Sequence, residues 1–220
     1  MTEVYIESGT KRVFACAYDW PGWCRSAKDE SGALAALGAY ASRYAPVAKR
    51  AQLPFDPGTA KAFRVVERVR GGANTDFGVP HEVAKRDSST LRAPEAQRLG
   101  ALVSAAWVVL DAVLKKAPAQ LRKGPRGGGR DRDQIAEHVL GAEAGIYARK
   151  LGLRFPVPAL GDAAEIKKFR KMLLEALRKP SSGAPPVDKG WPQRYAARRI
   201  ARYVLDHAWE IEDRSQPPEP

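Results

Sequence analysis

The stretch Arg194–Arg214, RYAARRIARYVLDHAWEIEDR, decides the fold expected for this chain. Its apolar residues recur at helical spacing and form one stripe, made of Ile200, Tyr203, Val204, His207, Ala208 and Ile211. His207 takes a position at which a purely structural helix would carry leucine. We therefore predict a long amphipathic helix that packs against other helices and turns a histidine toward them.

Three earlier segments also have helical periodicity. They are Ala93–Lys116, a segment from Asp131 or Asp133 to Leu151, and Asp162–Leu177, and loops that contain proline or glycine separate them. The second has an inner stripe made of Ile135, His138, Val139, Ala142 and Ile146. With the last helix they predict a four-helix bundle, a common place for metal and small-ligand sites. If the two histidine stripes face each other, His138 and His207 meet.

The N-terminal part predicts a small sheet. Val4–Glu7 and Arg12–Tyr18 are β-type runs joined by a turn, so they indicate a hairpin. The loop that follows contains Trp20 and Trp23, which cover the sheet or line a pocket; packing is favoured because a small sheet needs large apolar side chains. A helix capped by Ser26 or Asp29 should span residues 29–51, with Pro46 bending or ending it, before a strand near 62–69.

The whole chain is therefore expected to be α+β. Residues 1–70 form a β-β-α-β module, 71–92 a linker or loop region, 93–214 the bundle and 215–220 a disordered tail. His81 lies in the loop region, as a surface residue or as one that reaches a site.

Composition excludes some classes of protein. The 220 residues are 44% hydrophobic, enough for a core, and contain no apolar run long enough for a membrane span. The N-terminus does not have the pattern of a signal peptide, so a cytoplasmic location is expected. Cys16 and Cys24 do not have a zinc spacing and are expected to be free, small, buried side chains.

The chain is basic, with a net charge of +12. Residues 1–90 hold 13 basic and 10 acidic residues, and the remainder holds 24 and 15. The basic half can attract nucleic acid, anionic ligands or acidic partners, or it can be a solvated surface of an arginine-rich protein. For nucleic acid the candidate contacts are the basic faces Lys167–Lys171 and Arg194–Arg202 and a loop with Arg122, Lys123, Arg126 and Arg130. No helix-turn-helix, RRM or KH signature supports this alternative.

Residues 4–45 resemble the HicB-like fold of small antitoxin and related modules. The resemblance rests on the strand Val13–Tyr18, the loop Asp19–Gly22 and the segment Glu30–Leu34 that opens the helix. It implies an α+β module that binds a partner or is related to RNA.

Residues 93–214 resemble the DinB-like family of four-helix bundles. The matching pieces are the long first helix, the basic loop, Asp131–His138 at the start of the second helix, and a last helix with His207. In that family three histidines bind a divalent metal such as Zn²⁺ or Ni²⁺. The resemblance implies that His138 and His207 are two of the ligands. The third position falls on Tyr203 or Ile211, so the histidine set is incomplete.

Other residues near the two histidines are alternatives for the third ligand, namely His81, Glu143, Asp206 and Glu210. The opposite interpretation is that both histidines are hydrogen-bonded inside the bundle and bind no metal. The family's metal is associated with a low-molecular-weight thiol, which metal binding deprotonates. We therefore expect small-ligand binding or thiol-dependent transfer in a bundle pocket walled by Trp107, Tyr203 and Trp209. The alternative is a nucleic-acid or protein-interaction module that uses the basic faces.

Overall fold

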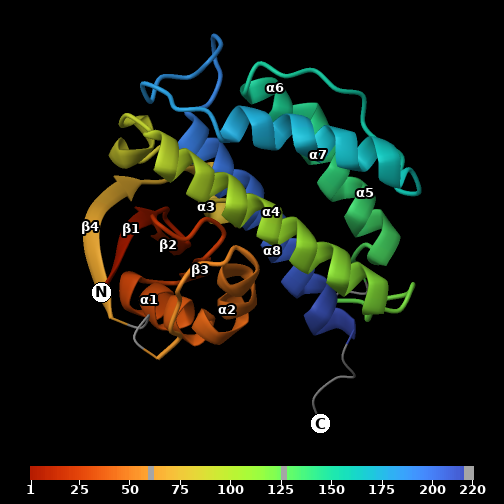
Figure 1. Cartoon of the computed structure of the whole chain (residues 1–220). Coiled ribbons are helices and arrows are strands. Elements are labelled where there is room, and N and C mark those ends of the chain that lie inside the picture. Colours follow the sequence, from red (N-terminus) through yellow and green to blue (C-terminus); the bar gives the residue numbers. More distant parts are fainter. Residues whose placement is uncertain (59–61, 125–127, 216–220) are drawn as a thin grey trace.

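The computed structural model describes residues 1–58, 62–124 and 128–215. Its fold is α+β, as predicted: a mixed sheet with helices comes first, and a largely helical region follows (Figure 1). Ser215 belongs to the last helix, and the rest of the predicted tail, 216–220, lies outside the described residues. Within the described ranges, no helix has the length and hydropathy of a membrane span.

The strands that the structure describes form one four-stranded sheet in the order β3-β2-β1-β4. Strands β1 (Thr2–Ser8) and β2 (Val13–Ala17) pair antiparallel, which confirms the hairpin, and β4 (Phe63–Arg70) pairs parallel to β1. The predicted order β-β-α-β is wrong because it omits β3 (Cys24–Ala27), which pairs with β2. This strand has only four residues, and its sequence CRSA contains no β-branched or alternating apolar pattern.

Two helices replace the single helix that was expected after the hairpin and the aromatic loop. Helix α1 (Glu30–Ala39) begins at Asp29, whose side chain accepts a hydrogen bond from the Gly32 N–H at 2.7 Å. Helix α2 (Ala41–Arg50) follows after a break at Tyr40. Pro46 lies inside α2 and does not end it, so that alternative is wrong, and the break lies at Tyr40 instead.

Trp23 packs into the core, as favoured from the sequence. It is fully buried, stacks on Tyr44 with ring centroids 5.7 Å apart, and donates a hydrogen bond to the Leu37 carbonyl at 2.9 Å. Trp20 contacts Tyr44 and Phe55 edge to face. The aromatic loop thus joins the sheet to α1 and α2.

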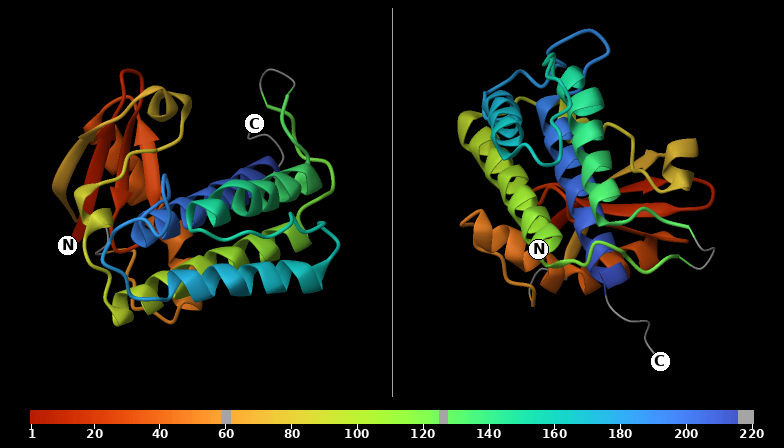
Figure 2. Two further views of the ribbon diagram at one scale, coloured as in Figure 1. Left: turned by 90° about the horizontal axis from the view of Figure 1, so that it is seen from above. Right: turned by 90° about the vertical axis from the view of Figure 1, so that its right-hand side faces the viewer.

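The predicted helices are all present in the described C-terminal part. They are α4 (Ala93–Lys116), a continuous helix made of α5 (Arg132–Ala142), a π-helical turn (Glu143–Tyr147) and α6 (Ala148–Lys150), then α7 (Ala163–Leu177) and α8 (Gln193–Ser215). Helices α4 and α8 pack against each other and separate the sheet and its helices from α5 and α7 (Figures 1 and 2). One cluster of buried apolar residues extends through both parts. The domain boundaries therefore stay a prediction.

The segment 71–92 packs between the sheet and α8. It contains the short helix α3 (Ala73–Phe77) and a 3-10 turn (Lys85–Ser88). The buried Glu7 side chain of β1 accepts hydrogen bonds from the Thr75 hydroxyl and from the N–H groups of His81 and Glu82, at 2.6, 2.9 and 3.1 Å. These bonds hold the segment against the sheet.

The Thr75 hydroxyl offers a test of this attachment. It donates to Glu7 and accepts from the Gly72 N–H at 3.0 Å, so Thr75→Val removes one buried and one partly buried hydrogen bond without changing shape. We expect a loss of about 1–2 kcal/mol in the free energy of unfolding, measured by urea denaturation. Thr10→Val is the matched control, because Thr10 donates to Asp76 at the same 2.6 Å but is exposed. Its expected loss is below about 0.5 kcal/mol. Equal losses in the two variants would contradict a structural role for the buried pair.

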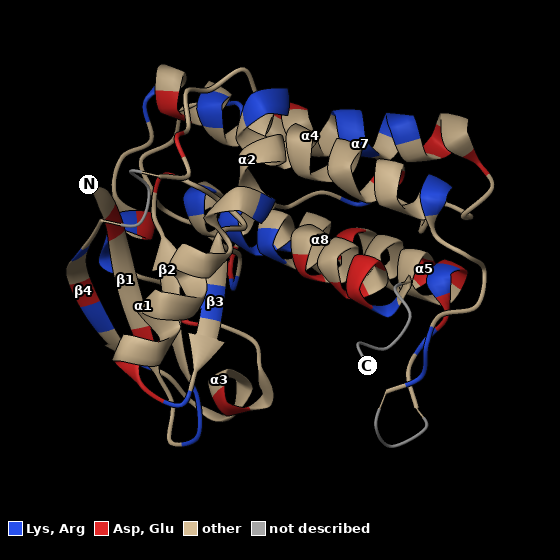
Figure 3. Ribbon diagram, turned by 90° about the horizontal axis from the view of Figure 1, so that it is seen from below, with Lys and Arg blue, Asp and Glu red and all other residues tan. Residues whose placement is uncertain are grey.

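The arginines in the N-terminal half of α8 face inward. Basic residues recur along the N-terminal half of α8 (Figure 3). Arg194, Arg198 and Arg199 are buried, although the sequence suggested an exposed basic face. Arg198 pairs with Asp87, and Arg199 donates to the Pro80 carbonyl. Because the segment 71–92 covers this side of α8, the face Arg194–Arg202 is not open to nucleic acid, and that expectation is wrong.

Candidate functional site

His138 and His207 lie next to each other, as the two stripes predicted. Their rings, from α5 and α8, are perpendicular, with centroids 5.4 Å apart. The Tyr203 hydroxyl is 2.6 Å from His138 Nε2, and Glu210 Oε2 is 2.9 Å from His207 Nδ1. Glu210 also accepts a bond from Arg214 at 2.8 Å. Each ring therefore has a hydrogen-bond partner inside the helical region.

The charges around this cluster favour a neutral His138. Burial, followed by the nearby positive charges of Arg130 and His207, lowers the pKa of His138. The hydrogen bond from His207 is the main cause that lowers the pKa of Glu210. The Tyr203 hydroxyl and Nε2 of a neutral His138 form a hydrogen bond, in which the tautomer of the imidazole decides the donor.

The residues at this cluster do not fit the divalent metal that the resemblance implies. A metal ligand must direct a free nitrogen lone pair at the ion, but Tyr203 occupies Nε2 of His138. The described ranges contain no group of three histidine, cysteine or acidic side chains placed to hold an ion. Ile211, the other position for a third ligand, is fully buried and apolar. The remaining candidate carboxylates are engaged elsewhere: Asp206 pairs with Arg25 and Arg202, and Glu143 accepts a bond from Trp107.

The three predicted pocket walls do not share one pocket. Tyr203 belongs to the histidine cluster, Trp209 to a groove between α2, α4 and the end of α8, and Trp107 to a groove between α4, α5 and α7. We call the last two the Trp209 groove and the Trp107 groove.

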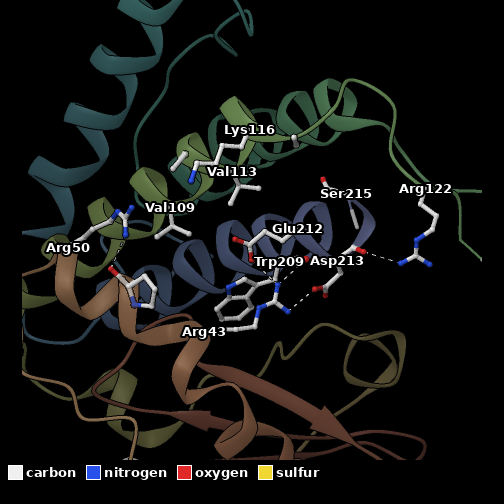
Figure 4. Close-up of a pocket in the computed structure, with 13 residues that line it drawn as sticks. Arg43, Arg50, Val109, Val113, Lys116, Arg122, Trp209, Glu212, Asp213 and Ser215 are labelled. Atoms are coloured by element: carbon white, nitrogen blue, oxygen red, sulfur yellow. Dashed lines mark hydrogen bonds and ion pairs between the residues drawn. The ribbon is translucent and has the colours of Figure 1, made fainter. Parts of the chain in front are cut away.

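The Trp209 groove has a volume of about 1140 Å³ and a charged rim (Figure 4). Arg43 lies against the Trp209 ring, 5.7 Å from its centroid, and pairs with Glu212 and Asp213 at 2.8 and 2.9 Å. Arg122 reaches the same end of α8 and donates to the Asp213 carbonyl at 3.0 Å. Both acidic residues of the lining therefore pair with Arg43, and Arg50, Lys116 and Arg122 leave the rim with an excess of positive charge.

The other predicted nucleic-acid contacts are only partly placed. Lys123 pairs with Asp131 at 2.8 Å, Arg130 is exposed, and Arg126 lies outside the described residues. Nucleic-acid binding through this loop stays a prediction.

The Trp107 groove is smaller and more apolar. Its volume is about 750 Å³, within the range of small-molecule sites. The apolar side chains that line it come from all three helices and from the loop before α7, and include Trp107, Val108, Leu110, Leu114, Val139, Leu140, Leu160, Ile166 and Leu174. Four basic and two acidic residues stand around it, and of these Arg170 is held by Asp111 through bonds of 2.6 and 2.9 Å.

Glu143 lies behind the Trp107 wall of this groove and is fully buried. Its Oε1 accepts a hydrogen bond from Trp107 Nε1 at 2.6 Å, while its Oε2 has no partner among the described residues. Burial raises the pKa of Glu143 to about 7, although the bond from Trp107 and the charge of Arg170 oppose this shift. A carboxyl group that titrates near neutral pH beside a pocket wall is typical of functional sites.

The π-helical turn explains why Glu143 points inward. The buried side of this helix contains Ile135, Val139, Glu143, Tyr147 and Leu151, a spacing of four residues. A regular α-helix repeats every 3.6 residues, so the wider π turn keeps these positions on one side. The predicted inner position Ile146 is wrong for the same reason, since its side chain is 52% exposed. The sequence offers Glu143 as an alternative metal ligand and does not show its hydrogen bond to Trp107.

Comparison of the chain with protein-family models, with curated proteins and with solved structures found no match. The candidate site therefore rests on the geometry described above.

Proposed function

We propose that this chain is a small-ligand-binding protein and that its ligand lies in the Trp107 groove. The observation that carries the proposal is an apolar groove of about 750 Å³ whose wall, Trp107, is backed by a buried carboxyl group. Ligand sites combine an apolar lining with a few polar groups that fix orientation. The Trp209 groove supports binding of an apolar ligand less well because six of its thirteen lining residues are charged, compared with six of eighteen in the Trp107 groove.

The charge distribution indicates the class of ligand. Lys167, Lys171 and Arg178 are exposed at the rim, Arg170 pairs with Asp111, and Lys171 lies 3.9 Å from Glu175. An apolar molecule with one anionic end would place its body against Val108 and Leu140 and its charge near these cations. A medium-chain carboxylic acid has this chemistry.

The family to which the fold of the helical part belongs is a proposal. We infer a bundle of the DinB-like kind, supported by the succession of helices α4, α5–α6, α7 and α8 and by the adjacent His138 and His207. The HicB-like character of the N-terminal module is likewise a proposal, supported by the hairpin and the helix that begins at Asp29. Thiol-dependent transfer is the weaker candidate, because the donors around the histidines do not fit the metal.

Isothermal titration calorimetry with decanoate and its shorter homologues tests the proposed site. We expect saturable binding by the parent chain and at least tenfold weaker binding by Val108→Asp, which introduces a charge into the apolar lining. Ile146→Asp is the control: Val108 and Ile146 are 48% and 52% exposed, lie on helices and change charge equally, but only Val108 lines the groove.

Two results would contradict the proposal. Equal weakening in both variants would place the bound molecule outside the Trp107 groove. The absence of saturable binding of any homologue by the parent chain would exclude this class of ligand.

A further inference from the structure

Cys16 and Cys24 face each other across the β2–β3 pair. They are direct partners in the antiparallel register, and the Ala17 N–H donates to the Trp23 carbonyl at 3.0 Å in the next pair along. Cys16 and Cys24 therefore occupy a non-hydrogen-bonded pair, the kind in which opposed Cα atoms and side chains approach most closely. Their Sγ atoms are 2.6 Å apart, and both thiols are free.

We propose that Cys16 and Cys24 are a redox-active dithiol that closes to a cross-strand disulfide. The opposed Cα atoms of a non-hydrogen-bonded pair are about 4.5 Å apart, within the range that a disulfide spans without movement of the backbone. Two buried cysteines that only fill space need no such alignment. This inference is independent of ligand binding in the Trp107 groove.

A small disulfide such as oxidised glutathione is the expected oxidant. Cys24 is 7% exposed and Cys16 is 3% exposed, so Cys24 is the thiol that the oxidant reaches first. The Cys24 thiolate attacks the disulfide and releases one glutathione thiol. Cys16 then loses its proton, attacks Sγ of Cys24 and releases the second thiol. Two protein thiols become one disulfide, and one glutathione disulfide becomes two thiols.

The surroundings supply positive charge for this exchange. A small cavity beside the two thiols is lined also by Tyr5 and by Arg198, Arg199 and Arg202 of α8. Burial raises the pKa of Cys16, and the positive charge of Arg198 opposes that rise. Burial is therefore expected to keep Cys16 as a thiol until an oxidant enters, and Arg198 favours the Cys16 thiolate that then attacks Cys24.

The test incubates the full chain, folded, with oxidised glutathione, then denatures it and alkylates it with N-ethylmaleimide. Intact mass should show loss of two hydrogens and no alkylation, whereas the chain kept in reduced glutathione should take two labels. Cys16→Ser and Cys24→Ser remove the partner thiol and serve as controls. Cys16→Ser should stop at one glutathione adduct on Cys24.

Three outcomes would overturn the proposal. The first is two N-ethylmaleimide labels on a chain that was incubated with oxidised glutathione for a prolonged time while folded. The second is a stable adduct with two glutathiones, and the third is a disulfide that forms only in urea. The melting temperature gives a second measurement, because a fitting cross-link should raise it by roughly 5 °C over the reduced chain. A fall would mean that the strands must move to form the bond, contrary to the register on which the proposal rests.

Discussion

Replacing Arg198 with methionine is expected to lower the free energy of unfolding by about 3–5 kcal/mol. Arg198 and Asp87 are both buried and form an ion pair through two guanidinium nitrogens, one bond measuring 2.8 Å. The third guanidinium nitrogen donates to the Tyr5 hydroxyl at 2.5 Å. Methionine keeps most of the side chain's length but leaves the Asp87 carboxylate in the interior without a counter-ion. This leftover charge causes most of the expected loss.

Two control variants separate this cause from lost packing. Arg198→Met combined with Asp87→Asn buries no unpaired charge and keeps an acceptor for the Ala84 N–H, so it should lose less stability than Arg198→Met alone. Lys168→Met breaks an exposed pair with Glu165 at 3.3 Å and should change stability by less than about 0.5 kcal/mol. Urea denaturation followed by circular dichroism measures all three. A loss below about 1 kcal/mol for Arg198→Met would contradict this account of the interface.

The same arginine shows a limit of sequence interpretation. The apolar spacing of α4 and α8 predicts their extent well, because helical periodicity over many residues reflects one buried side. Arg198 and Arg199 interrupt no apolar stripe, so the sequence suggests that both side chains are exposed. Their burial depends on Asp87 and Pro80, whose segment has no periodicity to show that it covers α8. Strand β3 was missed for a related reason, since only its pairing with β2 makes CRSA a strand.

The candidate site was predicted in part. The stripes bring His138 and His207 together, but the spacing does not show that the Tyr203 hydroxyl bonds to His138. Trp107 and Trp209 are both aromatic residues in helical stripes, yet they line different grooves because they lie on opposite sides of the α4–α8 pair. From the sequence Glu143 is only an alternative third metal ligand, and its hydrogen bond to Trp107 could not be predicted because the π-helical turn has no clear sequence signal.

Glu143→Gln is expected to make the stability of the chain less sensitive to pH. Burial raises the pKa of Glu143 from its ordinary value of 4.5 to about 7 in the folded chain. Between these values the folded chain holds a proton that the unfolded chain releases, so raising the pH favours unfolding. The contribution of Glu143 to stability is therefore complete below about pH 4.5, decreases through this interval and is lost above about pH 7.

The size of the effect follows from the same linkage. The free energy of unfolding of the parent chain should fall, relative to Glu143→Gln, by about 1.4 kcal/mol per pH unit in this interval and by about 3 kcal/mol in total. Glutamine keeps an oxygen that can accept from Trp107 Nε1 and carries no charge at any pH. Urea denaturation of both chains from pH 4.5 to 8 measures the difference.

Glu137→Gln is the control, because Glu137 lies on the exposed side of the same helix. The free energy of unfolding of this variant should differ from that of the parent chain by nearly the same amount at every pH in this range. A parallel pH profile for Glu143→Gln would mean that the folded chain does not hold the extra proton, and that Glu143 is ionised in its buried position. The unpaired Oε2 argues against that state, because an ionised carboxylate buried without a partner for one of its oxygens is costly. In the protonated state the carboxyl group carries no charge and can donate a hydrogen bond.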